Sequence, residues 1–302
     1  SSRTPHRNFF SSRRNAEAHE TLFLASAWRN CKQTKSSENT DDENKNNGLV
    51  KLIMKIGKLA RKRILSDVES LITRAVNRIV REKALVTEPK LTAELVMKIS
   101  SAIHYILTTF VQKYEFEMHA IFCHQQPYVN YSHAGKHKKC ELGDLLFVYD
   151  EADKIEGNSL LLQAKKATKI QFSKSDIDST QLFLYTDWPQ FKYCNQNLSN
   201  DTRCIDAKTV GTGAQYLVMF PPYDDSIQYR CVLPRDVISS SCLDKEILAE
   251  NIVGLFEFNT GRLYERNPNS SDEWAKMIYD LLNIEKISNK TRLYSCSQNS
   301  FQ

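Results

Sequence analysis

Two short apolar runs in the middle of the chain carry its clearest strand pattern. Residues 145–148 are Leu-Leu-Phe-Val and residues 160–162 are Leu-Leu-Leu, and a polar, turn-like segment separates them. Continuous apolar runs of this length are typical of strands that are buried on both faces of a sheet. The pattern therefore predicts two central strands that pair as a hairpin.

A longer pattern with helical spacing precedes this hairpin. Between residues 49 and 86, apolar residues recur every three or four positions, and the opposite face is rich in lysine and arginine. This spacing predicts one long helix, or two helices that divide at the capping pair Ser66-Asp67. A further helix is predicted over residues 91–113. The basic face is either solvated or a stripe that follows the phosphates of DNA.

The remaining elements complete a fold in which helices frame the strands. Further strands are predicted over residues 215–220 and 228–233, and further helices over residues 179–185, 244–258 and 272–282. Polar connections are predicted over residues 127–139 and 191–209. This mixture predicts an α/β (α+β) fold with helices around a sheet.

Composition divides the chain into four regions. Residues 1–48 are expected to combine a flexible basic tail, a short helix and a polar linker. Residues 49–113 are expected to form a helical arm that mediates dimerisation or clamps DNA. Residues 114–288 hold the α/β domain, and residues 289–302 are expected to be a polar tail.

Three polar residues lie at the edges of the two central strands. Asp144 precedes the first apolar run, and Gln163 and Lys165 follow the second. Residues two apart in a strand point to the same face, so Gln163 and Lys165 project together and a hairpin brings Asp144 beside them. Carboxylate and amide oxygens suit Mg²⁺, and a nearby lysine can orient a water and offset the charge of a phosphate.

This arrangement, Asp144…Gln163-Ala164-Lys165, resembles the PD-(D/E)xK (restriction-endonuclease-like) nuclease superfamily in its Q-x-K form. The resemblance covers roughly residues 115–235, and Gln163 replaces the usual second acid. It implies a restriction-endonuclease-like mixed central sheet flanked by helices, and a nuclease-like role for residues 114–288. It also implies Mg²⁺ as cofactor, with Mn²⁺ possible, and Asp144, Gln163 and Lys165 as catalytic residues. The implied activity is hydrolysis of DNA phosphodiester bonds, in restriction or anti-phage defence.

Further residues are candidates for this site. Glu141 is a candidate metal ligand, and the superfamily often adds a helix-borne glutamate, for which Glu94 and Glu117 are candidates. Gly143 is expected to mark a bulge that re-aims Asp144. The candidate contacts to nucleic acid are Lys136, Lys138, Lys139 and Lys166. The histidines and cysteines around residues 119–140 leave a zinc site as a weaker alternative, because their spacing matches no standard finger.

Composition limits the remaining possibilities. Charged residues make up 25% of the chain and the net charge is +5, which permits nucleic-acid binding without demanding it. The 8 dispersed cysteines suit reduced thiols in a cytoplasmic protein, and no run is long enough to span a membrane. No P-loop pattern is present, so any ATPase or regulatory activity would come from a partner subunit. A homodimer is the default, and the alternative to an enzyme is a catalytically inactive nucleic-acid-binding or scaffold subunit.

Overall fold

The structure is a computed structural model, and all of its described residues fall in one compact unit, Leu52–Gln302. It describes residues 58–82, 87–110, 116–123, 127–152, 154–167, 172–195, 198–223, 226–238, 247–283 and 292–298. The tail, short helix and linker expected over residues 1–48 lie outside the described residues. No helix in the described ranges is both long and apolar enough to cross a membrane.

A mixed sheet forms the centre of this unit. Its strands follow the order β10-β1-β4-β5-β7-β8, and β9 pairs with the first half of β5. Only β5 and β7 run parallel within this sheet as described. The strands are β1 (Phe116–Phe122), β4 (Leu145–Glu151), β5 (Glu156–Lys166), β7 (Ala214–Tyr223), β8 (Ser226–Val232), β9 (Arg262–Glu265) and β10 (Arg292–Gln298). The predicted hairpin of two central strands is therefore confirmed as β4 and β5.

A second, smaller sheet has the order β3-β2-β6. It comprises β2 (Tyr128–His133), β3 (Lys136–Glu141) and β6 (Phe191–Tyr193). A two-residue turn joins β2 to β3, and both of its residues have positive φ, 49° at Ala134 and 73° at Gly135, as two-residue hairpin turns commonly require. The polar connections expected over residues 127–139 and 191–209 are therefore partly strands.

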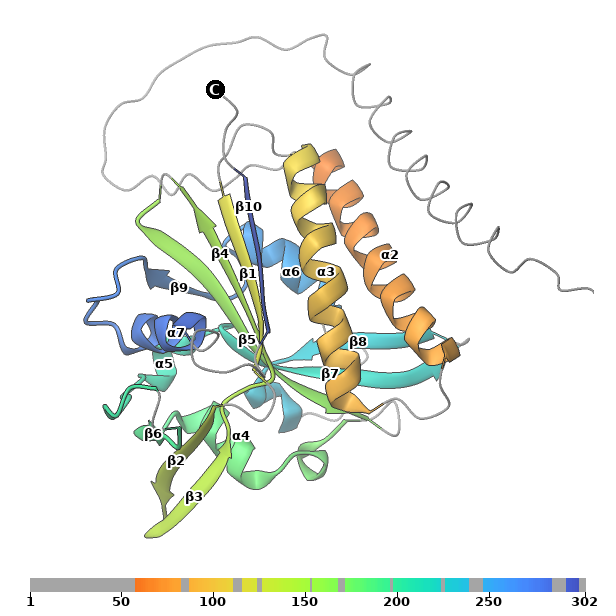
Figure 1. Ribbon diagram of the computed structural model, residues 1–302. Helices are drawn as coiled ribbons and strands as arrows, with labels where there is room; N and C mark the ends of the chain where they lie inside the picture. Colours follow the sequence, from red (N-terminus) through yellow and green to blue (C-terminus); the bar gives the residue numbers. More distant parts are fainter. Residues whose placement is uncertain are drawn as a thin grey trace, which may run out of the picture. The chain divides into compact units, whose positions relative to one another are not determined.

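Helices cover both faces of the large sheet. Buried side chains of α2 (Lys58–Glu82), α3 (Glu88–Phe110) and α6 (Leu248–Phe256) pack against one face. Those of α4 (Ser179–Asp187) and α7 (Glu273–Asn283) pack against the other, together with the small sheet and the short helix α5 (Ala207–Val210). Figure 1 shows α2 and α3 side by side along the sheet, with α7 across from them. The fold is thus α/β with a mixed sheet between helical layers.

The helices expected as an arm form one of these layers. Ile64, Val68, Leu95 and Ile99 are buried in the same core as the strands, so α2 and α3 stabilise the sheet. The helix α2 continues through Ser66 and Asp67, where a break was possible. Amphipathic spacing predicted both helices, but it could not show which surface their apolar faces would cover.

The C-terminal segment also differs from expectation. Within the expected polar tail, β10 pairs with β1 in an antiparallel register from Phe116↔Gln298 to Phe122↔Arg292. Its sequence, Arg-Leu-Tyr-Ser-Cys-Ser-Gln, has only a short apolar stretch. Backbone pairing with β1, rather than an apolar run, therefore defines this strand.

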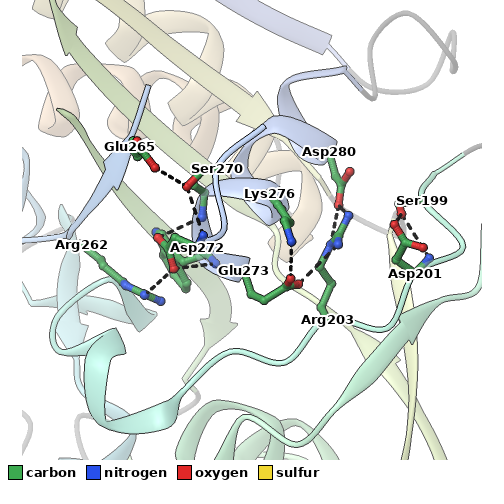
Figure 2. Close-up of polar contacts among 12 residues, drawn as sticks. Ser199, Asp201, Arg203, Arg262, Glu265, Ser270, Asp272, Glu273, Lys276 and Asp280 are labelled. Atoms are coloured by element: carbon green, nitrogen blue, oxygen red, sulfur yellow. Dashed lines mark hydrogen bonds and ion pairs between the residues drawn. The ribbon is translucent and has the colours of Figure 1, made fainter. Parts of the chain in front are cut away.

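A network of ion pairs joins α7 to the segment that follows β6 (Figure 2). Arg203 is 4% exposed, and its Nε donates to Asp280 Oδ2 at 2.9 Å. Its Nη1 lies 3.4 Å from Glu273 Oε2, and the other oxygen of Glu273 accepts from Lys276 Nζ at 2.6 Å. The buried Arg203 therefore links the segment after β6 to two half-buried carboxylates, two turns apart on α7.

We predict that Arg203→Ala lowers the free energy of unfolding by about 2 kcal/mol, because it removes the charged hydrogen bonds to Asp280 and Glu273, whose carboxylates are half-buried. Urea denaturation measures this change. Arg235→Ala is the control, because that side chain is 78% exposed and lies 3.9 Å from Asp236. The control should stay within about 0.5 kcal/mol of the wild type. Equal midpoints for the two variants would show that the network contributes little.

Candidate functional site

Asp144 and Gln163 meet where β4 begins. The β4–β5 register pairs Leu145 with Leu162, so Asp144 and Gln163 are the next facing residues. The Asp144 N–H donates to Leu162 O at 2.9 Å. Asp144 Oδ2 accepts from Ala164 N at 2.8 Å and also from Gln163 Nε2. Each of the two side chains is 1% exposed, so these two of the three expected residues meet in the interior.

Lys165 belongs to the same face of the sheet as this pair. Side chains alternate along a strand, and Leu146 and Leu161 lie in the core under α4 and α7, whereas Leu145 and Leu162 lie in the opposite core. By the same alternation, Asp144, Gln163 and Lys165 face α4 and α7. Lys165 is half-buried, and Lys166, on the opposite face, is exposed. This arrangement is consistent with the prediction that Gln163 and Lys165 project from the same face of the sheet.

The charge of Lys165 acts on the beginning of α4. Asp178 caps this helix, and its carboxylate Oδ1 accepts from Thr180 N at 2.8 Å and from Gln181 N at 3.2 Å. Burial disfavours ionisation of Asp178, but these hydrogen bonds, with the charge of Lys165 added, lower its pKa. The Asp178 carboxylate is therefore an anion close enough to Lys165 to interact with its charge.

Close packing holds the backbone just before Asp144. A Cβ on Gly143 would lie 2.7 Å from Leu161 Cδ1 and 3.1 Å from the Tyr185 hydroxyl. That hydroxyl donates to Leu142 O at 2.9 Å. The glycine is therefore explained by the close approach of β5 and α4. The β4–β5 ladder begins only at Leu145 and has no shift in register, so the bulge expected at Gly143 is not seen there.

Neutral groups surround the Asp144 carboxylate. Burial raises the pKa of the Cys123 thiol, and the charge of Asp144 raises it further. Burial also raises the pKa of the Tyr185 phenol well above its usual range, and the charge of Asp144 adds to this effect. Both groups are therefore protonated at neutral pH, and they contribute no second negative charge beside Asp144.

Glu141 lies close to this site but has its own partner. It ends β3, and a carboxylate oxygen accepts from the Tyr128 hydroxyl at 3.2 Å. The pKa of Tyr128 is raised by burial, then by Glu141, and also by the charge of Asp144. The charges of Glu141 and Asp144 therefore both act on the Tyr128 phenol, so the two carboxylates lie in the same part of the structure.

Gln163 provides the oxygen that suits a metal best. Its Oε1 is buried and has no hydrogen-bond partner among the described residues, and neither has the hydroxyl of its β7 neighbour Tyr216. An amide oxygen without a partner suits Mg²⁺, which keeps several waters and takes few protein ligands. In this structure the Nε2 of the same amide, rather than Oε1, faces the Asp144 carboxylate. In the described part of the chain, no group of three or more His, Cys, Asp or Glu residues is placed to bind a metal. This result gives no support to the zinc alternative.

The structure separates the two candidates for a helix-borne acid. Glu94 lies on α3, and its side chain is outside the described part of the structure. Glu117 lies on β1 and pairs in register with Asp150, whereas Phe122 at the other end of β1 pairs with Leu145. Glu117 is therefore neither on a helix nor near Asp144.

One acid that was not predicted, Glu88, contacts the backbone directly after the Gln163-Ala164-Lys165 motif. Glu88, in the first turn of α3, accepts a hydrogen bond from Lys166 N at 2.7 Å through Oε2. The backbone after Lys165 is therefore tied to a helix on the other face of the sheet. The chain position of Glu88, beside Pro89, gave no signal for this contact, because it depends on tertiary packing.

The predicted nucleic-acid contacts from the basic segment lie on β3 rather than in a loop. Lys136 and Lys139 are exposed, and Lys138 is half-buried. Lys139 Nζ lies 4.9 Å from the centroid of the Tyr128 ring, so its charge stands over an aromatic face. Because side chains alternate along β3, Lys139 faces away from Lys136 and Lys138.

Comparisons with protein-family models, with curated protein sequences and with solved structures find no match to this chain. The residues of the site, rather than a relative, therefore support any functional proposal.

We predict that Asp144 stabilises the fold as well as forming the site. Asp144→Ala leaves two buried donors, Ala164 N and Gln163 Nε2, without their acceptor, and we expect it to cost about 2–4 kcal/mol. Asp144→Asn keeps one acceptor oxygen and should cost less. Unfolding in urea measures both variants, and Asp201→Ala, at an exposed position, serves as the control. An Asp144→Ala variant as stable as this control would contradict the two hydrogen bonds.

Proposed function

We propose that this chain is a Mg²⁺-dependent endonuclease that hydrolyses phosphodiester bonds of DNA. The observation that supports it most is the pairing of Asp144 with Gln163 at the joined ends of two central strands. Lys165 follows on the same face. One carboxylate, one free amide oxygen and one cation at a single strand end are the groups that this chemistry requires.

Each residue has a defined role in this proposal. Asp144 and Gln163 Oε1 would hold Mg²⁺, which when bound supplies a positive charge that activates water and stabilises the phosphate. The hydrogen bond from Ala164 N fixes the Asp144 carboxylate in position. Lys165 would orient the attacking water and offset the negative charge that develops on the phosphate.

The sheet and its flanking helices are compatible with the restriction-endonuclease-like class that we propose. The mixed sheet has β1, β4 and β5 antiparallel and β7 parallel to β5, and helices flank both faces. A mixed sheet between helices is the general class that the D…Q-x-K resemblance implies, and the restriction-endonuclease-like arrangement itself belongs to the proposal. DNA as substrate, a role in restriction or anti-phage defence, a homodimer and an ATPase or regulatory partner follow from that resemblance or from analogy, and they remain proposals.

A second candidate function is a nucleic-acid-binding or scaffold subunit without catalysis. One observation favours it, because Gln163 Nε2 already donates to Asp144 and both side chains are 1% exposed. With glutamine in place of an acid, the pair carries one negative charge, which weakens its attraction for a divalent cation. Detectable cleavage by the wild-type chain separates the two candidates.

We predict that the purified chain nicks supercoiled plasmid DNA with Mg²⁺ or Mn²⁺, and that Lys165→Ala slows this by about 10²–10³-fold. Loss of the lysine removes a charge that acts in the transition state, so the rate at saturating DNA should fall. The control is Lys208→Ala, which removes an exposed lysine from α5. Unchanged cleavage by Lys165→Ala would exclude the assigned site, and DNA binding without cleavage by the wild type would favour the second candidate.

We predict that Gln163→Glu makes stability depend strongly on Mg²⁺. Two adjacent buried carboxylates repel each other, so the variant should unfold at a lower temperature than the wild type in EDTA. Added Mg²⁺ should restore much of this loss, because binding to the folded state stabilises it. Thermal unfolding over a Mg²⁺ series measures the effect.

The control for this experiment is Gln215→Glu. Gln215 is also buried on the large sheet, but it donates to Thr212 O and Asn251 Oδ1 and belongs to the opposite face. This variant should be destabilised with no rescue by Mg²⁺. Equal Mg²⁺ responses of the two variants would contradict a metal site at Gln163.

A further inference from the structure

The three-stranded sheet β3-β2-β6 has one buried face and one exposed face. Side chains of the buried face contribute to the core under α4, and they include Val129, Tyr131, Cys140, Phe191 and Tyr193. On the other side lies a set of exposed side chains that we name the outer face. It consists of Asn130, Ser132, His137, Lys139 and Lys192.

Two lysines of the outer face stand in one row. The register pairs Asn130 with Lys139 on one side and with Lys192 on the other. Because neighbouring strands are about 4.8 Å apart, the two lysines begin about 10 Å from each other with an amide between them. This row presents two cations and a hydrogen-bonding group to solvent, which suits an anionic backbone.

One acid of the hairpin, Glu141, points to the same side of the small sheet as this row. Along β3, Glu141 shares the side of Lys139, and it accepts the hydrogen bond from the Tyr128 hydroxyl. The Tyr128 ring also lies under Lys139 Nζ. The outer face itself has two lysines and no carboxylate, and Glu141 adds one negative charge at the base of the hairpin.

Beyond this row the hairpin continues as a two-stranded ribbon. The strand β6 pairs only with Val129–Tyr131, and no other described strand pairs with the tip from Ser132 to His137. All residues of the tip are exposed, and Figure 1 shows β2 and β3 extending away from the large sheet. A two-stranded ribbon is one of the two elements that the major groove of B-DNA admits.

The basic helix α2 is a weaker candidate for the same role. Arg61 donates to Glu257 at 2.9 Å and to Glu250 at 3.2 Å, which directs its charge toward α6. Asp67, on the same helix, lies within the fields of Arg63 and Arg74. Part of the positive charge that the sequence places on this helix is therefore balanced inside the protein.

We propose that the outer face and tip of the β2–β3 hairpin bind duplex DNA. Lys139 and Lys192 contact phosphates, and the tip enters the major groove. Because Asp144 follows the end of β3 after two residues, this would bring the duplex to the part of the fold that carries Asp144 and Gln163. This last step rests on the proposed nuclease function, whereas the binding itself does not.

Equilibrium binding tests the proposal. Fluorescence anisotropy with a short labelled DNA duplex, in EDTA and over a range of salt, gives affinity and its salt dependence. Lys139→Ala/Lys192→Ala should weaken binding and lower the slope of log K against log salt by about 2, one unit for each phosphate contact. Lys62→Ala/Arg63→Ala removes the same charge from exposed positions of α2 and should leave the slope unchanged.

A duplex RNA of the same sequence tests the groove. Its major groove is deep and narrow and does not admit the tip, although its phosphate charge is similar, so it should bind more weakly than DNA. Equal affinities for DNA and RNA would overturn the claim that the tip enters the major groove. A reduced salt slope in the α2 variant, with an unchanged slope in the hairpin variant, would overturn the claim that the hairpin binds DNA. Hairpin-dependent binding without cleavage would refute the nuclease function only, and cleavage with hairpin-independent binding would refute this inference only.

Discussion

The carboxylate of Asp144 is the interaction on which the centre of the molecule depends. It accepts hydrogen bonds from the backbone of Ala164 and the side chain of Gln163, and so joins β4 to β5 beyond the end of their ladder. A buried carboxylate is costly unless donors satisfy it, so this end of the hairpin is held in one geometry. Any chemistry at this site therefore uses a group that the fold has already fixed.

The sequence carried enough information for the parts of the fold that bury continuous apolar surface. The runs before Asp150 and before Gln163 predicted the central hairpin, and period-two geometry predicted the common face of Gln163 and Lys165. The hairpin of β2 and β3 was missed, because only its inner residues are buried and its strands contain Asn, Ser, His and Lys. A hairpin with one solvated face leaves a weak apolar pattern, so the basic residues there suggested a loop.

Long-range contacts explain the other differences. The apolar stripe of α2 was evident, but its packing against the sheet depends on strands that begin only at Phe116, far beyond the end of the helix. The contact of Glu88 with Lys166 N, and the pairing of β10 with β1, likewise join segments far apart in the chain. Local sequence cannot specify such partners, because burial against a distant surface overrides local propensity.

The short connection between β3 and β4 links the candidate site to the hairpin that carries the outer face. The strand β3 ends at Glu141 and β4 begins at Leu145, so the segment between them carries Asp144 directly from the base of the hairpin. The Tyr185 hydroxyl holds this segment at Leu142 O, and the space beside Gly143 is filled by Leu161. A polyanion bound along the hairpin would thus be placed relative to Asp144 by short, packed connections. Such rigid support is what catalysis needs, because small errors in the position of a reacting group cost large factors in rate.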